Sequence, residues 1–339
     1  MKRNFYILFT VIVSAITSFA ALADNSFNSV KKKAENGDDM AQYDMGTRYN
    51  FAKGVSKDIT KAVYWYKKSA EQGFAPAQYN LGCCYENGWG IEKNAAAAFK
   101  WYSEAAKSEF APALYNLSVC YKDGVGTNKD FKKSVEYLEK SAKKGFATAQ
   151  YNLGVYYEEG TFFEKNPKKA ALWYTIAADN GDAMAQCNLG WCYETGFGVP
   201  QDMKEAIRFW EISAKNGNAM AQFNLGVCYD FGKGVKRDIV KAVKYYEVAA
   251  SQKFVAAQYS LADCYLKGDG VKKDKILAMA WFLCALNGGD ARANNMVNGL
   301  LKELPENDIK EAVNLARKFL GAKKKNYFYY ALSKEYHEI

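Results

Sequence analysis

Histidine is almost absent from this chain, which contains a single one, His337, among 339 residues. This scarcity excludes a Ser-His-Asp triad, a Cys-His pair and a histidine-based zinc site from the body of the protein. The Gly-x-Gly turns follow helical patterns rather than strands, so they do not form a nucleotide-binding fingerprint. We therefore expect no catalytic residues, no metal site and no cofactor, and the sequence contains no recognisable nucleic-acid-binding module.

Strand-like alternation and long apolar runs are also missing from the body of the chain. The absence of period-two alternation favours an all-α protein. One apolar run, from Phe5 to Ala20, follows Met1-Lys2-Arg3 and precedes Ala21-Leu22-Ala23. This pattern is typical of a secretory signal cleaved after Ala23, with an uncleaved membrane anchor as the alternative. No later run is long enough to span a bilayer, so we expect a periplasmic or secreted protein.

Regularly paired cysteines are lacking as well, although the chain has eight cysteines. Five occupy one repeat position: Cys84, Cys120, Cys192, Cys228 and Cys264. Equivalent points of stacked helix pairs lie about 10 Å apart, which is beyond the reach of a disulfide. No Cys-x-x-Cys occurs either. We expect small buried cysteines rather than a disulfide framework, with one bridge among Cys83, Cys187 and Cys284 as the alternative.

The sequence is rich in one feature, a repeat of 36 residues that runs from 41 to 293 without insertion or deletion. An Ala-Gln pair heads most copies, at 41–42, 77–78, 149–150, 185–186, 221–222 and 257–258. A fixed period of this size is typical of an array of small stacked units.

Each copy predicts two helices joined by a glycine-rich turn. Ala77, Leu81 and Tyr85 lie on one face of a first helix. Gly88 ends that helix, and Asn94 is a suitable N-cap for the second helix. A small residue recurs inside the first helix, at Gly46, Gly82, Ser118, Gly154, Gly190, Gly226 and Ala262. Its recurrence predicts that a second helix packs closely at this point.

The run Ala-Gln-Tyr-Asn-Leu-Gly at 77–82, with Tyr85, Gly88 and Gly90 after it, resembles the Sel-1-like repeat (SLR), a relative of the tetratricopeptide repeat. The resemblance implies an all-α, right-handed α/α superhelical solenoid that binds other proteins. The chain would then comprise four parts: a signal peptide at 1–23, an N-terminal capping segment at 24–38, seven repeats at 39–290, and C-terminal capping helices with a basic and aromatic tail at 291–339.

One face of the first helices is a candidate binding surface, because it points away from the buried stripe on a helical wheel. Its aromatic residues are Tyr43, Tyr79, Tyr115, Tyr151, Phe223 and Tyr259, with Trp191 in the adjacent column and Cys187 as an interruption. Acidic residues border it, at Glu86, Glu158, Glu194 and Asp230. Such a trough could hold a peptide, a helix or a glycan. Alternatively, the rings pack against the next repeat.

Two further features depart from plain repeat packing. Phe162 and Phe163 replace the second glycine and the valine of a turn, and would either form an exposed contact site or fold into the core. Asparagines at one position, from Asn80 to Asn224, are expected to bond the adjacent inter-helix loop.

We therefore expect an exported interaction scaffold that is monomeric, binds a protein or peptide, and acts in envelope signalling or host interaction. Lysine runs at 31–33 and 323–325 offer peripheral contact with an anionic membrane as a minor alternative. The alternative function is a penicillin-binding or weakly β-lactamase-like protein. Ser141 and Lys144 match the Ser-x-x-Lys element of such enzymes, but the other elements are missing, and Lys is routine at a helix surface.

Overall fold

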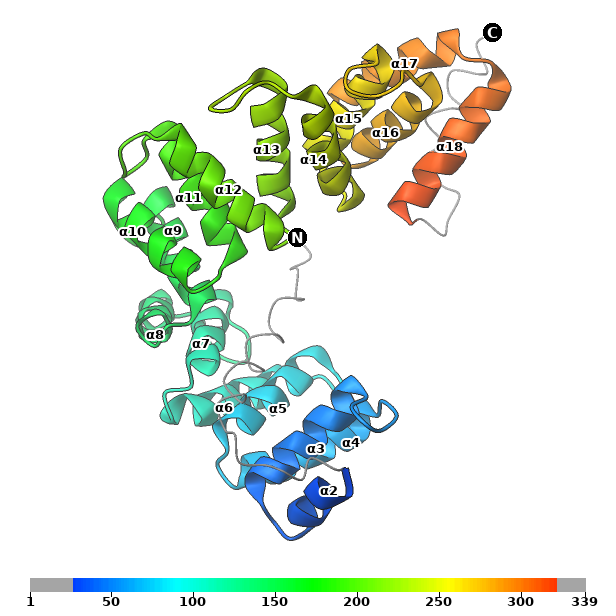
Figure 1. Cartoon of the computed structure of the whole chain (residues 1–339). Helices are drawn as coiled ribbons and strands as arrows, with labels where there is room; N and C mark the ends of the chain where they lie inside the picture. Colours follow the sequence, from blue (N-terminus) through cyan, green and yellow to red (C-terminus); the bar gives the residue numbers. More distant parts are fainter. Residues whose placement is uncertain (1–26, 322–339) are drawn as a thin grey trace. The chain divides into compact units, whose positions relative to one another are not determined.

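The computed structural model describes residues 27–321, and all its regular elements there are helices (Figure 1). A short helix comes first, α2 (Phe27–Glu35). Seven helix pairs follow: α3 (Asp39–Phe51) and α4 (Ile59–Glu71), α5 (Ala75–Asn87) and α6 (Ala95–Lys107), α7 (Ala111–Asp123) and α8 (Phe131–Lys143), α9 (Ala147–Glu159) and α10 (Pro167–Asp179), α11 (Ala183–Thr195) and α12 (Met203–Lys215), α13 (Ala219–Phe231) and α14 (Ile239–Ser251), α15 (Val255–Lys267) and α16 (Lys275–Asn287). Helices α17 (Arg292–Glu303) and α18 (Glu306–Leu320) end the array. The predicted all-α solenoid of helix pairs is confirmed.

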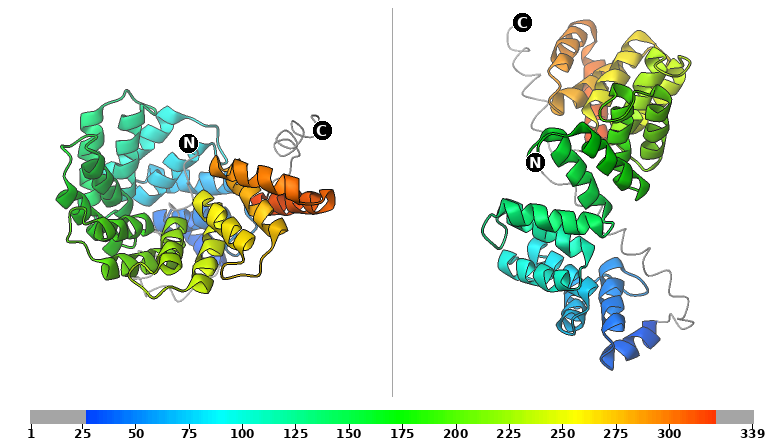
Figure 2. Two further views of the ribbon diagram at one scale, coloured as in Figure 1. Left: turned by 90° about the horizontal axis from the view of Figure 1, so that it is seen from above. Right: turned by 90° about the vertical axis from the view of Figure 1, so that its left-hand side faces the viewer.

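The chain divides into two compact units, Met1–Lys144 and Gly145–Ile339. The first unit contains α2 and three helix pairs, and the second contains four pairs and the two terminal helices. Within each unit, the second helix of one pair packs against the first helix of the next (Figure 2). The predicted signal segment 1–23, the lysines at 323–325 and the tail 326–339 lie outside the described residues. Among the helices that are described, none has the length and apolar character to cross a membrane.

The boundaries of the helices follow the predicted capping signals. The carboxylate of Asp58 accepts a hydrogen bond of 2.9 Å from the backbone N–H of Lys61 at the start of α4. The predicted N-cap series is confirmed at Asp58, Asn94, Asp130, Asn166, Asp202, Asp238 and Asp274. The first helices end in the left-handed region, as at Gly88 with a φ of 74°, where glycine is strain-free.

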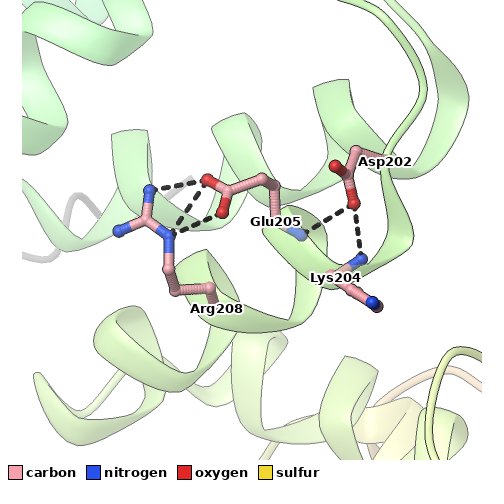
Figure 3. A network of polar contacts seen from close by, with 4 residues as sticks. All are labelled: Asp202, Lys204, Glu205 and Arg208. Atoms are coloured by element: carbon pink, nitrogen blue, oxygen red, sulfur yellow. Dashed lines mark hydrogen bonds and ion pairs between the residues drawn. The ribbon is translucent and has the colours of Figure 1, made fainter.

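Figure 3 shows one of these helix starts in detail, at α12. Asp202 accepts hydrogen bonds from the backbone N–H groups of Lys204 and Glu205, at 2.9 and 3.2 Å. The Glu205 carboxylate then pairs with the Arg208 guanidinium, with 2.7 Å between Oε2 and Nη2. Because these side chains lie at the surface, the ion pair adds little stability, whereas a cap is worth about 1 kcal/mol. The network stabilises the first turn of α12.

Close packing at the small residue of each first helix is confirmed. A Cβ added to Gly82 would lie 2.6 Å from Cε1 of Tyr102, so only glycine leaves room for the ring. The same arrangement joins Gly46 to Tyr66, Gly154 to Tyr174, and Gly226 to Tyr246. The third repeat instead has Ser118, whose hydroxyl lies 3.3 Å from that of Ser134, and Leu138 takes the place of the tyrosine. Size at the two positions is therefore matched in these repeats, whereas the seventh repeat combines Ala262 with Phe282.

The buried glutamine of the Ala-Gln pair ties neighbouring helix pairs together. Its amide N–H donates to a backbone carbonyl near the end of the preceding second helix, as from Gln186 to Ala178 at 3.1 Å. In four repeats its amide oxygen also accepts from a residue 30 positions later, as from Asn180 to Gln150 at 2.8 Å and from Asn216 to Gln186 at 2.9 Å, whereas the oxygen of Gln78 is buried without a partner. Satisfied buried amides of this kind fix the register of the stack. This role explains the recurrence of the pair.

Helix α16 is apolar on nearly every side because other helices surround it. Helix α18 packs on it through Ile309, Ala312 and Ala316, all buried. The rings of Trp281 and Phe319 stack with centroids 4.2 Å apart. The sequence predicts a helix over Asp308–Leu320, and the structure places it at Glu306–Leu320.

Candidate partner-binding face

Two of the predicted face residues, Tyr43 and Tyr79, are buried in the core, with 5% and 2% of their surface exposed. The ring of Tyr79 lies between those of Tyr102 and Phe110, at centroid distances of 5.9 and 5.6 Å. Tyr43 is held in the same way by Tyr66 and Phe74. For these two residues the packing alternative is the better interpretation, and their rings are not available to a partner.

The remaining aromatic residues of the face are half-buried: Tyr115, Tyr151, Trp191, Phe223 and Tyr259. Tyr151 contacts the ring of Tyr174 at 5.8 Å, but the position that holds Phe74 and Phe110 in the first unit is Asp182 in this repeat. Asp182 caps α11 by accepting from Ala185 at 2.8 Å. An aspartate gives the helix a cap but covers the tyrosine less than a phenylalanine would. Tyr151 is half-buried, as are Tyr115 and Phe223, whose repeats keep a phenylalanine at this position, Phe146 and Phe254.

The acidic border has a structural role in three of the four repeats where the sequence placed it. The buried hydroxyl of Tyr102 donates to Glu86 at 2.6 Å, and that of Tyr246 donates to Asp230 at 3.2 Å. Tyr174 donates to Glu158 in the same way. Burial raises the pKa of each of these tyrosines, so the hydroxyl keeps its proton and remains a donor.

Glu194 is the exception, because its repeat has Trp210 in place of the tyrosine. The Trp210 indole donates to the backbone carbonyl of Cys187 at 3.1 Å and so leaves the carboxylate of Glu194 without a tyrosine donor. The same tryptophan explains why Cys187 interrupts the aromatic column, since a larger ring opposite requires a smaller residue. Glu194 is half-buried and lies one helical turn from Trp191. Of the four acids of this face, Glu194 is the one whose carboxylate accepts no tyrosine hydroxyl.

Phe162 and Phe163 pack onto their own helix, α9. Phe162 contacts Tyr156 and Phe163 stacks on Tyr157, each with centroids 4.5 Å apart. Both rings are half-buried. Neither of the two predicted placements, fully exposed or in the core, describes them.

The asparagine column lies next to tyrosines of the preceding repeat, with Asn80 near the Tyr43 hydroxyl and Asn188 near that of Tyr151. The side-chain oxygen of Asn80 is buried without a hydrogen-bond partner. The bond to the inter-helix loop stays a prediction. Sequence periodicity locates the asparagine but does not identify the residue across the helix interface.

All eight cysteines are free thiols, and all are buried. Burial raises the pKa of Cys84, Cys187 and Cys192 to about 12, so these thiols stay protonated and unreactive at neutral pH. Among residues 27–321, no group of three His, Cys, Asp or Glu side chains could hold a metal ion. The predicted burial of the cysteines is confirmed.

Ser141, the candidate nucleophile of the hydrolase alternative, is fully buried. Its hydroxyl donates to the backbone carbonyl of Ala111 at 2.7 Å. Lys144, the lysine of the same element, pairs with Glu109 instead. A nucleophile must reach a substrate and have a nearby base, and Ser141 has neither. The arrangement is that of a helix-packing serine, repeated at Ser69 and Ser213.

Comparison with known proteins assigns the fold to a family. The Sel1 repeat model matches seven consecutive stretches, at 39–74, 75–109, 111–146, 147–182, 183–218, 219–254 and 255–290. The chain belongs to the Sel1 repeat family. A search of curated proteins finds no match.

Two solved Sel1 repeat structures are similar over most of the chain. One is a protective antigen of uropathogenic Escherichia coli with an SLR fold, 33% identical, with a TM-score of 0.67 over 87% of this chain. This chain spans 63% of that protein's length. The other is a Sel1 repeat protein from Oxalobacter formigenes, 31% identical, with a TM-score of 0.64 over 72% of this chain and 96% of that one.

Proposed function

We propose that this Sel1 repeat scaffold is exported and binds a basic segment of a partner protein on the face formed by Tyr151, Trp191, Glu194, Phe223 and Tyr259. All five residues belong to the second unit. The observation that carries the proposal is the row of half-buried rings in four consecutive repeats of that unit. Aromatic residues, above all Trp and Tyr, are enriched among the residues that contribute most to the affinity of protein interfaces.

The chemistry of the partner follows from the acids of the same face. Glu158 and Asp230 each accept one tyrosine hydroxyl, and Glu194 has no such donor. A lysine or arginine of the partner would pair with Glu194 while its aliphatic stem packs on Trp191. Ser141 does not support the hydrolase alternative, because it is buried and its hydroxyl donates to the carbonyl of Ala111.

Photo-crosslinking tests the binding face directly. Benzoylphenylalanine replaces Trp191 in one protein and Leu172, which is 56% exposed on the second helix α10, in the control. We expect a discrete crosslinked partner from position 191, weakened by the added change Glu194→Lys, and none from position 172. Equal crosslinking from both positions, or none from 191, contradicts the proposal.

Export requires a separate test, since it rests on the N-terminal pattern alone. We expect the protein to fractionate with the periplasm or the culture medium and to begin at Asp24 when its N-terminus is sequenced. A cytoplasmic protein that begins at Met1 would contradict export and leave the binding face unaffected.

A further inference from the structure

The turn between α13 and α14 exposes two large apolar side chains that the repeat does not require. Phe231, the last residue of α13, is 68% exposed, and Val240, in the first turn of α14, is 51% exposed. The backbone N–H of Asp238 donates to the carbonyl of Tyr229 at 2.8 Å, so the two ends of the turn meet. At the Phe231 position most other repeats have polar residues: Asn87, Asp123, Glu159, Thr195 and Lys267. Repeat packing therefore does not explain an exposed phenylalanine.

A shallow pocket of about 570 Å³ lies at the same turn. Its lining residues are Tyr229, Lys236, Arg237, Asp238, Ile239, Val240 and Lys241. Three of these are cationic. The one carboxylate, Asp238, already caps α14 by accepting from the backbone N–H of Lys241 at 2.9 Å. The pocket therefore combines positive charge with apolar walls.

The fold holds two of the three cations in place. The Nζ of Lys241 donates to the Tyr229 hydroxyl and lies 3.9 Å from the ring centroid. The Nε of Arg237 donates to the backbone carbonyl of Asp230 at 2.7 Å, and its guanidinium lies 4.0 Å from the carboxylate of the same residue. Cations that are already positioned lose little side-chain entropy when an anion binds.

The next repeat has two further cations in the equivalent turn. Lys272 and Lys273 stand 36 residues after Lys236 and Arg237, just before the following second helix, α16, and Asp269 and Asp274 accompany them there. Both helix pairs belong to the second unit. The turns after α13 and α15 therefore carry four cations at equivalent positions, Lys236 and Arg237 in one repeat and Lys272 and Lys273 in the next.

We propose that this edge docks on an anionic membrane surface, with a lipid phosphate in the pocket and with Phe231 and Val240 in the interfacial region. Basic residues near a bilayer are attracted by anionic headgroups, and exposed apolar side chains add affinity by leaving water. A protruding phenylalanine and an aliphatic valine beside the cations favour a lipid surface over nucleic acid, which cations alone would bind. The five residues named for the proposed partner-binding face lie outside this edge, and Asp230 borders both.

Vesicle sedimentation tests the inference, with the protein from Asp24 to Ile339, which includes every described residue. The vesicles are phosphatidylcholine alone, or phosphatidylcholine mixed with phosphatidylglycerol. We expect binding only with phosphatidylglycerol, weakened about tenfold or more by Lys236→Glu with Arg237→Glu. Phe231→Ser should weaken it several-fold.

Matched controls carry the same changes at the opposite edge of the second unit. Lys215→Glu with Lys253→Glu repeats the charge change, and Met220→Ser, at a residue 42% exposed, repeats the apolar one. We expect both controls to bind like the unchanged protein, and all variants to keep its melting curve.

Unchanged binding by the edge variants, equal loss in the controls, or binding of polyglutamate or duplex DNA without vesicle binding would each overturn the inference. Crosslinking from position 191 should be unaffected by the edge variants, so the two proposals fail separately.

Discussion

The sizes of several buried side chains in this protein match those of their neighbours in the same helix pair. Gly82 leaves room for Tyr102, whereas Ser118 faces Leu138. Trp210 is matched by a small residue, Cys187, across the interface. Most repeats share the glycine and tyrosine pair, and the others reach a similar backbone geometry by other combinations of volumes, which is how densely packed interiors accommodate change.

The variant Gly82→Ser should lower the free energy of unfolding by about 1–3 kcal/mol, because the new Cβ would lie 2.6 Å from the Tyr102 ring. Combining it with Tyr102→Leu, as in the third repeat, should cost less than the sum of the single changes. Urea unfolding of the four proteins measures this coupling. Strict additivity would show that the two positions do not share the space.

The backbone of Lys253 is strained. This residue adopts a φ of 67° at a position where five other repeats have glycine. The left-handed region strains a residue with a Cβ by about 1–2 kcal/mol. Lys253→Gly should therefore raise the melting temperature, with a gain of about 1 kcal/mol or less after the added chain entropy. Lys253→Ala is the control and should show no gain. A lower melting temperature for the glycine variant would contradict the strain.

At the scale of helices, the last pair differs from the others because it must end the stack. The second helix α16 is covered by α18, with Ile309 5% exposed at the contact. Ile309→Ala should cost about 2–5 kcal/mol. Since repeats are stabilised by their neighbours, amide exchange should accelerate first in α16 and α18. Asn314→Ala, on the exposed side of α18, should have little effect, and equal losses in both variants would contradict the capping role.

The sequence predicts helices and their ends well because these depend on nearby residues. The N-cap at Asp58, the glycine at 82 and the burial of Cys192 all follow from a 36-residue period and a helical wheel. Exposure of the aromatic face could not be predicted in this way. The burial of Tyr79 depends on Phe110 in the following turn, and the half-burial of Tyr151 accompanies Asp182 at the equivalent position. The role of Glu86 likewise depends on a partner in another helix, Tyr102.

For the whole molecule, buried thiols make stability sensitive to alkaline pH. Burial raises the pKa of seven cysteines to about 12: Cys83, Cys84, Cys187, Cys192, Cys228, Cys264 and Cys284. An unfolded thiol ionises from about pH 8.5. The unfolded state therefore loses protons first, and the free energy of unfolding should fall as pH rises from about 9 to 12.

Urea unfolding at pH 8 and pH 10 measures this effect. Each thiol can contribute up to about 1.4 kcal/mol per pH unit in this range. Replacing Cys192 and Cys228 by alanine should flatten the dependence, after allowance for the lost packing. Buried tyrosines contribute in the same direction at higher pH, so a small slope should remain. A midpoint independent of pH would show that the thiols are accessible to solvent.

The proposed binding of a partner depends on several consecutive repeats, because residues from each of them form the binding face. Once crosslinking from position 191 has identified the partner, its affinity is the most direct test. The variant Trp191→Ala with Glu194→Lys is compared with Leu172→Ala with Glu211→Lys, a control on second helices of the same unit. We predict that the first weakens binding by about 30-fold or more, since an aromatic anchor carries about 2 kcal/mol, and that the control leaves it unchanged. Equal affinity of the folded Trp191 and Glu194 variant and the unchanged protein would contradict the account.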